Sequence, residues 1–130
     1  MVIGIGTDMV EVDRIVGVLS RRGESFARRI LTPVEFEAFQ SKKDKARFLA
    51  KRFAAKEAAA KALGTGFRLG VSWQDFEVIN DELGKPCLLL RGKAQSIMQE
   101  KGAGSSHLSI SDEKHYAIAF VVFSAGGKSE

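Results

Sequence analysis

Apolar and polar positions along the chain predict a mixed set of strands and helices. Val2–Gly6 is a short apolar run typical of a buried strand, and Met9–Ser20 has the pattern of a first helix. Thr7 or Asp8 would cap that helix, because Asp8 with Glu11 three residues later resembles a capping box. We therefore expect a strand that leads almost directly into a helix.

Two further helices have clear boundary signals. Thr32, Pro33 and Glu35 match a capping residue, a first-turn proline and a capping partner, which predicts a helix over Pro33–Gln40. The longest periodic segment, Asp44–Leu63, is rich in Ala, Lys, Arg, Leu and Glu, all good helix formers. As a helix it would be roughly 30 Å long at ~1.5 Å per residue, which makes it the central helix of the fold.

The second half of the chain predicts two hairpins with a helix between them. The turn Asp81–Gly84 separates the first two strands. In chain order the elements are Phe76–Asn80, Pro86–Leu90, the helix Gly92–Lys101, His107–Ser111 and His115–Phe123. Strands and helices that are grouped rather than alternating favour an α+β fold, with an antiparallel sheet packed against the long helix and the shorter ones.

Length and composition indicate one globular domain. The chain has 130 residues, 45% of them hydrophobic, and we expect a single domain over 1–124 with a flexible tail at 125–130. No apolar run approaches the ~20 residues of a membrane-spanning helix, so we expect no membrane insertion. Cys87 is the single cysteine and cannot form an internal disulfide, which fits a reducing, cytoplasmic location.

The net charge of the chain limits the classes of partner that it is expected to bind. A net charge of +4 favours an anionic partner, which leaves nucleic acid, a phosphorylated small molecule or an acidic protein. Nucleic acid is the weakest of the three, because the chain has only one Trp and one Tyr, and most of its nine Phe fall in core-like patterns. A single-strand binder needs exposed rings beside basic residues. We therefore expect no nucleic-acid partner.

Two carboxylates have positions that suit chemistry. Asp8 follows an apolar strand, where functional groups are common, although a plain helix cap would explain it too. On a helical wheel Glu57 lies at the edge of the apolar stripe of the long helix, so it must be paired or hold a metal. An intrahelical pair with Lys61 is the simpler explanation. Lys51, Arg52 and Lys56 on the same helix suggest a solvated basic face.

Small and polar residues supply the rest of a candidate phosphate site. Gly64, Thr65 and Gly66 form a tight loop that could approach a phosphate, or merely end the helix. His107 and Ser109 lie on the same face of their strand. This polar face could belong to a binding site, or it could simply be solvated. Taken together with the carboxylates, these groups would suit magnesium with phosphate, since Mg²⁺ typically uses one or two protein carboxylates and completes its shell with phosphate oxygens and water.

Several runs resemble a known family. They are Ile5–Ile15 (IGTDMVEVDRI), Phe26–Glu35 (FARRILTPVE), Phe48–Ala58 (FLAKRFAAKEA) with Lys61 and the Gly64–Gly66 loop, Gly84–Pro86, and His107–Ser111. In this order they resemble the holo-[acyl-carrier-protein] synthases, the short, trimeric group of 4′-phosphopantetheinyl transferases. The resemblance implies the fold of that group. Asp112 is a departure, since many relatives are expected to have histidine there.

The resemblance also implies an activity. The family transfers 4′-phosphopantetheine from coenzyme A to a serine of apo acyl carrier protein, giving the holo protein and 3′,5′-ADP, in support of fatty acid biosynthesis. By motif, Asp8 and Glu57 would hold Mg²⁺ and Lys61 would assist transfer. The residues expected to bind coenzyme A are Arg52, Lys61, Gly64, Thr65, Gly66 and His107. Arg14, with Arg21 or Arg28, would face the acidic carrier, and a homotrimer would place active sites between subunits.

Overall fold

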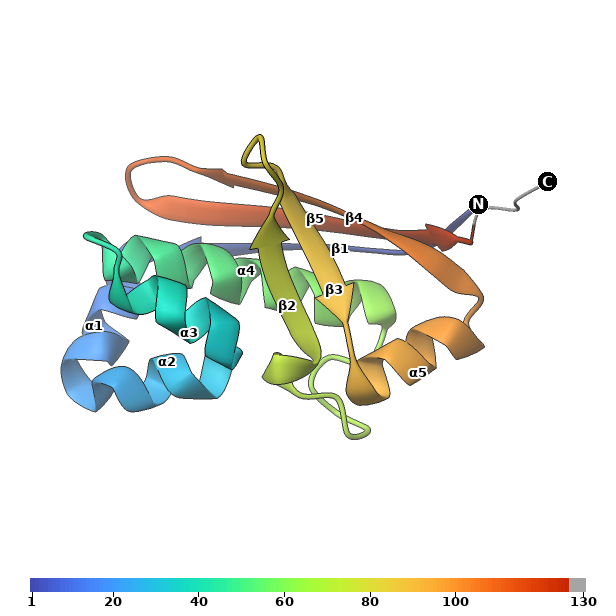
Figure 1. Cartoon of the computed structure of the whole chain (residues 1–130), viewed down its shortest axis with the longest axis horizontal. Helices are drawn as coiled ribbons and strands as arrows, with labels where there is room; N and C mark the ends of the chain where they lie inside the picture. Colours follow the sequence, from blue (N-terminus) through green and yellow to red (C-terminus); the bar gives the residue numbers. More distant parts are fainter. Residues whose placement is uncertain (127–130) are drawn as a thin grey trace.

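The chain folds around one long helix that lies against a three-stranded antiparallel sheet (Figure 1). The structure is a computed structural model that describes residues 1–126. The sheet has the order β1 (Val2–Glu11), β5 (Tyr116–Ala125) and β4 (Ala103–Asp112). The helix, α4 (Lys45–Leu63), packs on β1 and β5. The expected α+β class with an antiparallel sheet and a long central helix is confirmed.

The other elements cover the side of α4 that faces away from the sheet (Figure 1). α1 (Val12–Arg22), α2 (Glu24–Ile30) and α3 (Pro33–Gln40) gather near the start of α4. The hairpin of β2 (Phe76–Asn80) and β3 (Pro86–Leu90) crosses beside its middle, between the short 3₁₀ turn η1 (Trp73–Asp75) and α5 (Gly92–Glu100). The bounds predicted for α3, β2 and β3 are confirmed.

The first strand is longer than its sequence predicts. β1 continues through Asp8 to Glu11, so the helix expected to begin at Met9 begins at Val12. Asp8 lies opposite Ala119 in the ladder to β5, and no side chain caps the helix, so the capping box at Asp8 and Glu11 was wrong. The ladder to β5 determines the boundary, because these pairings satisfy backbone groups that a helix would otherwise have used.

α4 approaches β1 unusually closely. The buried residues of α4 are mostly alanine, and β1 carries glycine at Gly4 and Gly6. A Cβ added at Gly6 would lie 2.1 Å from the carbonyl oxygen of Ala58, and one at Gly4 would lie 2.0 Å from that of Ala62. Small residues on both sides therefore let the helix backbone touch the strand, so that side chains of the two elements meet at short range.

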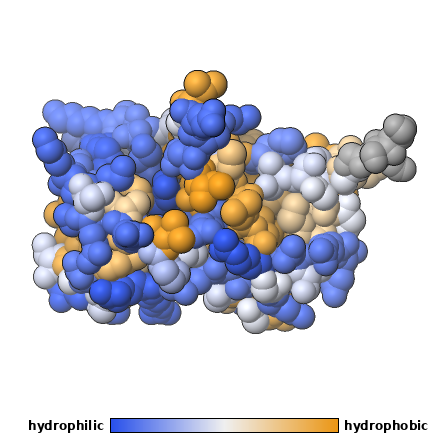
Figure 2. Space-filling model, in the orientation of Figure 1, coloured by the Kyte–Doolittle hydropathy of each residue, from blue (hydrophilic) through white to orange (hydrophobic). Residues whose placement is uncertain are grey.

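The C-terminal tail is only partly within the described residues. β5 extends to Ala125, whose N–H donates to the carbonyl of Met1 at 2.8 Å. The tail expected at 125–130 therefore begins inside a strand, and residues 127–130 lie outside the described residues. Figure 2 shows apolar side chains gathered over the β2–β3 hairpin, where Leu83 at its tip is 95% exposed. Ile79 and Leu89 are exposed on the same hairpin.

Candidate active site

Asp8 and Lys61 form an ion pair where β1 and α4 meet. Lys61 Nζ lies 3.1 Å from Asp8 Oδ1 and donates to the carbonyl of Thr7 at 3.0 Å. The Asp8 carboxylate is half-buried, and the hydroxyl of Thr7 donates across the ladder to the carbonyl of Ala119. Lys61, near the end of α4, thus points toward the middle of β1. Asp8, which we expected at the end of a strand, lies within the sheet.

Glu57 belongs to the same group of charges. Burial raises the pKa of Glu57, and the negative charge of Asp8 raises it further, whereas Lys61 and Arg14 lower it. Within the described residues the ion pair of Lys61 is with Asp8, and none joins it to Glu57, so the simple intrahelical pair is wrong. Two half-buried carboxylates from different elements therefore share one electrostatic environment with a lysine and an arginine.

This arrangement fits a divalent cation. The negative charge of Asp8 raises the pKa of Glu57, because the two carboxylates repel each other. A cation between them would be attracted to both. No cluster of three or more His, Cys, Asp or Glu residues occurs within residues 1–126. A pair of carboxylates is nevertheless the protein contribution that Mg²⁺ typically uses when phosphate and water complete its shell. Asp8 and Glu57 therefore suit a magnesium ion that arrives with a phosphate ligand.

The glycine loop follows directly after this group. Gly64 ends α4 in the left-handed conformation, with φ +89°, and its N–H donates to the carbonyls of Ala60 and Lys61. The N–H of Gly66 also donates to Ala60, and Thr65 is buried with its hydroxyl donating to the carbonyl of Gly66. The loop therefore ends α4 as a helix C-cap, which is one of the two alternatives that the sequence left open. It begins less than one helical turn after Lys61.

Arg52 lies apart from the carboxylate pair. Its guanidinium lies over the ring of Phe48, 4.5 Å from the ring centre, and its Nη2 donates to Asn80 at 3.3 Å. Within residues 1–126 its buried Nε has no hydrogen-bond partner, and it lies 3.8 Å from Glu35 Oε2. Burial lowers the pKa of Arg52. Arg52 and Lys56 are both buried, so the solvated basic face expected for Lys51, Arg52 and Lys56 is wrong at these two positions, whereas Lys51 is half-buried.

His107 lines a separate hollow on the outer side of the sheet. Its ring Nε2 lies 3.2 Å from the hydroxyl oxygen of Ser124, and the side chain is exposed, like that of Ser109. The hollow has a volume of about 320 Å³ between β3 and the face of β4 and β5. Its lining includes Lys85, Pro86, Cys87, His107 and Phe120. A histidine, a lysine and a proline-containing strand end therefore meet there, without Asp8 or Lys61.

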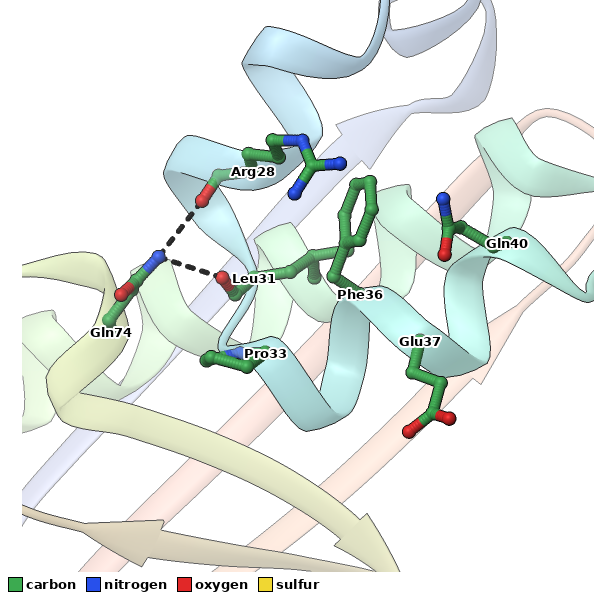
Figure 3. Close-up of a pocket in the computed structure, with 7 residues that line it drawn as sticks. All are labelled: Arg28, Leu31, Pro33, Phe36, Glu37, Gln40 and Gln74. Carbon is green, nitrogen blue, oxygen red and sulfur yellow. Dashed lines mark hydrogen bonds between the residues drawn. The ribbon is translucent and has the colours of Figure 1, made fainter.

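The basic residues expected to face a partner lie on α1 and α2. Arg14, Arg21 and Arg28 are all exposed. Figure 3 shows the guanidinium of Arg28 over the ring of Phe36, 4.1 Å from the ring centre, at the edge of a hollow of about 410 Å³. The side-chain amide of Gln74 closes the other side by donating to the carbonyls of Arg28 and Leu31. This hollow is lined by none of the carboxylate-site residues.

The turn between β4 and β5 is held by a group of contacts that the sequence did not reveal. Arg47 lies 3.1 Å from Asp112 Oδ2 and also donates to the carbonyls of Glu113 and Lys114. Lys51 lies 3.7 Å from the other oxygen of Asp112. Asp112 thus ties the hairpin to α4. No local signal marks this, because the partners are more than 60 residues apart.

Comparison with known proteins agrees with this geometry. The model of the 4′-phosphopantetheinyl transferase superfamily matches residues 4–121. The chain therefore belongs to the 4′-phosphopantetheinyl transferase superfamily. The holo-[acyl-carrier-protein] synthase of Vibrio atlanticus is 60% identical over 121 residues, which are 93% of this chain and 96% of that protein. Within the superfamily the similarity is thus to the holo-[acyl-carrier-protein] synthases, a group of enzymes.

Solved structures show the same similarity. The crystal structure of the synthase from Neisseria meningitidis matches with a TM-score of 0.88 and 46% identity, covering 95% of this chain and 99% of that one. The synthase from Bacillus anthracis, solved in complex with CoA (3′,5′-ADP), matches with a TM-score of 0.81 and 40% identity. It covers 96% of this chain and 98% of that one. Residues 1–126 contain no helix with the length and apolarity needed to span a bilayer.

Proposed function

We propose that this chain transfers 4′-phosphopantetheine from coenzyme A to a serine hydroxyl of apo acyl carrier protein. The serine oxygen bonds to the β-phosphorus, the bond from that phosphorus to the bridging oxygen breaks, and 3′,5′-ADP leaves. The hydroxyl proton passes to a base, for which Glu57, a water molecule and another carboxylate are the candidates. The observation that carries this proposal is the meeting of Asp8, Glu57 and Lys61 from β1 and α4. Relatives with the name of this activity share 54–60% identity over nearly the whole chain.

Asp8 and Glu57 would hold Mg²⁺ together with the pyrophosphate of coenzyme A. When bound, the ion supplies positive charge that stabilises the negative charge developing on the phosphate oxygens. The half-buried position of both carboxylates strengthens their attraction for a cation, because screening by water is weaker there. These two residues thus orient the donor, and phosphoryl transfer depends mainly on such positioning and charge neutralisation.

Lys61 and the glycine loop would stabilise the phosphates directly. The Nζ of Lys61 is already held by Asp8 and the Thr7 carbonyl, so it can donate its remaining hydrogen to a phosphate oxygen without a large loss of side-chain freedom. Gly64 and Gly66 carry no side chain that would keep a phosphate from the backbone. These contacts favour the leaving 3′,5′-ADP, since it carries more negative charge as the bond breaks.

The nucleotide end of coenzyme A would use Arg52 and His107 from a site between subunits. In the ladders, Asp8 pairs with Ala119, whereas His107 lies across β5 from Ile5. Strand spacings of about 4.8 Å and rises of about 3.4 Å per residue separate Asp8 from His107 by roughly 14 Å within one sheet. A second subunit that brings its His107 to the Asp8 of the first would complete the site, as the expected homotrimer would allow.

The outer face of the sheet supports this assembly. β1 and β5 present large apolar side chains to solvent there, and Phe120 is 47% exposed. The others are Val2, Ile5, Met9 and Ile118. A contiguous apolar surface of this kind marks an interface more often than a free face. We propose that it is covered by neighbouring copies of the same chain.

An acidic carrier protein would approach the basic helices. Arg14 lies within electrostatic range of Glu57, so a carrier bound at α1 delivers its serine beside the carboxylates. Arg21 and Arg28 extend the same charge along α1 and α2. Complementary charge of this kind raises the association rate, and the rate falls as salt rises. The reaction would supply holo carrier protein for fatty acid biosynthesis in the cytoplasm.

Intact-protein mass spectrometry tests the proposed function. An apo acyl carrier protein is incubated with this protein, coenzyme A and Mg²⁺, and its mass is measured. We expect a gain of one phosphopantetheine group, absent when EDTA is added or when the acceptor serine is replaced by alanine. No gain with a carrier that another transferase modifies under the same conditions would contradict the proposal. Light scattering on the same sample measures the expected trimer.

A further inference from the structure

A fully buried lysine lies next to Glu57. Lys56 is 0% exposed, and its Nζ donates to the carbonyl of Ile30 at 2.7 Å and to Glu35 Oε1 at 2.6 Å. Lysine is almost never buried completely unless it is paired. The proposed chemistry uses Glu57, Asp8 and Lys61 but not this lysine. Its presence in the core, one residue before the carboxylate, therefore requires another explanation.

The partner carboxylate joins three elements at one point. Glu35 Oε1 also accepts from the N–H of Thr32 at 2.9 Å, and its Oε2 accepts from the N–H of Val78 at 2.6 Å. Both oxygens are thus occupied, and Arg52 contributes a further positive charge. Glu35 therefore ties α4 to the start of α3 and to the middle of β2, while Lys56 itself reaches the end of α2.

Most of the buried positions of α4 carry only a methyl group. Its buried positions are dominated by alanine, and the members are Ala50, Ala54, Ala55, Ala58, Ala59, Ala60 and Ala62. Methyl groups have no directional bonds, so the orientation of α4 depends on its polar contacts. Those of Arg47 with the β4–β5 turn and of Lys61 with Thr7 and Asp8 lie toward its two ends, and those of Lys56 lie between them. The hydrogen bonds of Lys56 are directional, and a buried pair is better evidence for a defined arrangement than for stability.

We propose that Glu35 and Lys56 are positioning residues that set the rotation of α4 and thereby aim Glu57 at Asp8. The inference rests on the proposed metal-holding role of that carboxylate pair. Consecutive side chains leave a helix about 100° apart, so fixing one fixes the direction of the next. At a side-chain radius of about 6 Å, a rotation of about 20° would move the Glu57 carboxylate by about 2 Å. Displacements of about 1 Å can cost on the order of 100-fold in rate.

The substitution Lys56→Met tests the inference without relying on turnover. Met keeps the length of the side chain and removes its donors and charge. Mn²⁺ binding is measured by electron paramagnetic resonance in the presence of coenzyme A, with the variant and the wild-type protein side by side. We expect binding to weaken by about 10–100-fold, the range seen when groups that orient metal ligands are removed. The KM for apo carrier protein should remain unchanged, because Arg14 and Arg21 are untouched.

A control variant separates aiming from general destabilisation. Ile97→Ala removes a buried side chain from α5, outside the Glu35–Lys56 pair. It should lower the melting temperature while leaving Mn²⁺ binding within about twofold of wild type, since α5 does not set the rotation of α4. If Lys56→Met lowers the melting temperature but binds Mn²⁺ like the wild type, the pair is merely structural and the inference is overturned.

A double variant decides the matter even if the single variant does not fold. Glu35→Gln combined with Lys56→Met removes both members of the pair together, so neither is left unpaired, and Arg52 keeps its hydrogen bond to Asn80. It should fold more stably than Lys56→Met alone and still bind Mn²⁺ at least tenfold more weakly than wild type. Wild-type binding by the double variant would overturn the inference. A wild-type protein that binds Mn²⁺ but modifies no carrier would refute the proposed function instead, and would leave the positioning result standing.

Discussion

Replacing Gly6 with alanine should separate the carboxylates of Asp8 and Glu57 without changing either residue. A Cβ at this position would lie 2.1 Å from the carbonyl oxygen of Ala58 and 2.7 Å from the nitrogen of Ala62. Both atoms belong to the backbone of α4, so no flexible side chain can give way. Since unstrained contacts need more than about 3 Å, the helix must move outward from β1 by about 1 Å. That movement carries Glu57 and Lys61 away from Asp8.

The substitution Gly6→Ala should change the stability of the fold much less than it changes the rate of the reaction. Overpacking of a tight contact costs about 1–3 kcal/mol. Most small domains have about 5–15 kcal/mol of stability, so the variant should remain almost entirely folded at 25 °C. A displacement of about 1 Å at the reacting groups, by contrast, can lower the rate about 100-fold. The loss of activity should therefore far exceed any loss of folded protein.

The assay compares Gly6→Ala with the matched variant Gly17→Ala. Gly17 lies inside α1, where an added Cβ would meet only the flexible end of Arg21 at 3.3 Å. Alanine should stabilise that helix by about 1 kcal/mol, because glycine is a poor helix former. Circular dichroism gives the melting temperature of each variant, and mass spectrometry gives kcat/KM for carrier modification. We expect Gly6→Ala to melt lower with a large loss of kcat/KM, and Gly17→Ala to melt higher with wild-type activity.

A particular result would refute this reasoning. If Gly6→Ala melts lower than wild type but keeps kcat/KM within about twofold, a shift of about 1 Å between β1 and α4 has no effect on the chemistry. The close approach of Gly4 and Gly6 to the helix would then serve packing alone.

Three other substitutions test other parts of the site. Because burial and Asp8 raise the pKa of Glu57, its ionised form costs stability above the pKa it has in the unfolded chain. Glu57→Gln should therefore melt higher than wild type at neutral pH in EDTA, and the difference should disappear as the pH falls through the raised pKa. Arg21→Glu should lower kcat/KM for an acidic carrier and flatten its salt dependence, with KM for coenzyme A unchanged. Phe120→Asp should convert the expected trimer to monomers in light scattering and abolish activity, and an active monomer would contradict a site shared between subunits.

Elements with local signals were predictable from the sequence. The capping box at Thr32 is formed as expected, since its two partners lie within three residues and need no tertiary support. The hairpin of β2 and β3 is likewise determined by its own turn, with Phe76 opposite Leu90. In both cases the free energy that selects the structure is contained in a short stretch of chain.

Elements that depend on distant pairing were not predictable in the same way. The local capping signal at Asp8 and Glu11 suggested a helix, but pairing with β5, more than 100 residues away, extends the strand through both. Glu35 was identified as a capping residue, which it is, while its bond to Lys56 depends on how α3 meets α4. The helical pattern of the sequence places Lys56 on one face of the long helix, but it does not show whether other elements pack against that face.

The contact between Asp8 and Lys61 also joins two residues that are far apart in the sequence. Lys61 was assigned to Glu57 by spacing on one helix, yet its ion pair is with Asp8 on a strand 53 residues away. Spacing along a helix identifies neighbours only within that helix. The family motifs included both residues, but the contact between them required the close packing that Gly6 allows.

The pairing of β1 with β5 has a consequence for synthesis on the ribosome. β1, which carries Asp8, is made before the strand beside it, Tyr116–Ala125, and more than 100 residues separate the two. Until β5 emerges, β1 has no strand beside it, because β4 pairs with β5 rather than with β1. Contacts of such high sequence separation form slowly, since a long loop must close first. A nascent chain should therefore have no transferase activity, and protease protection of β1 should arise in one late step.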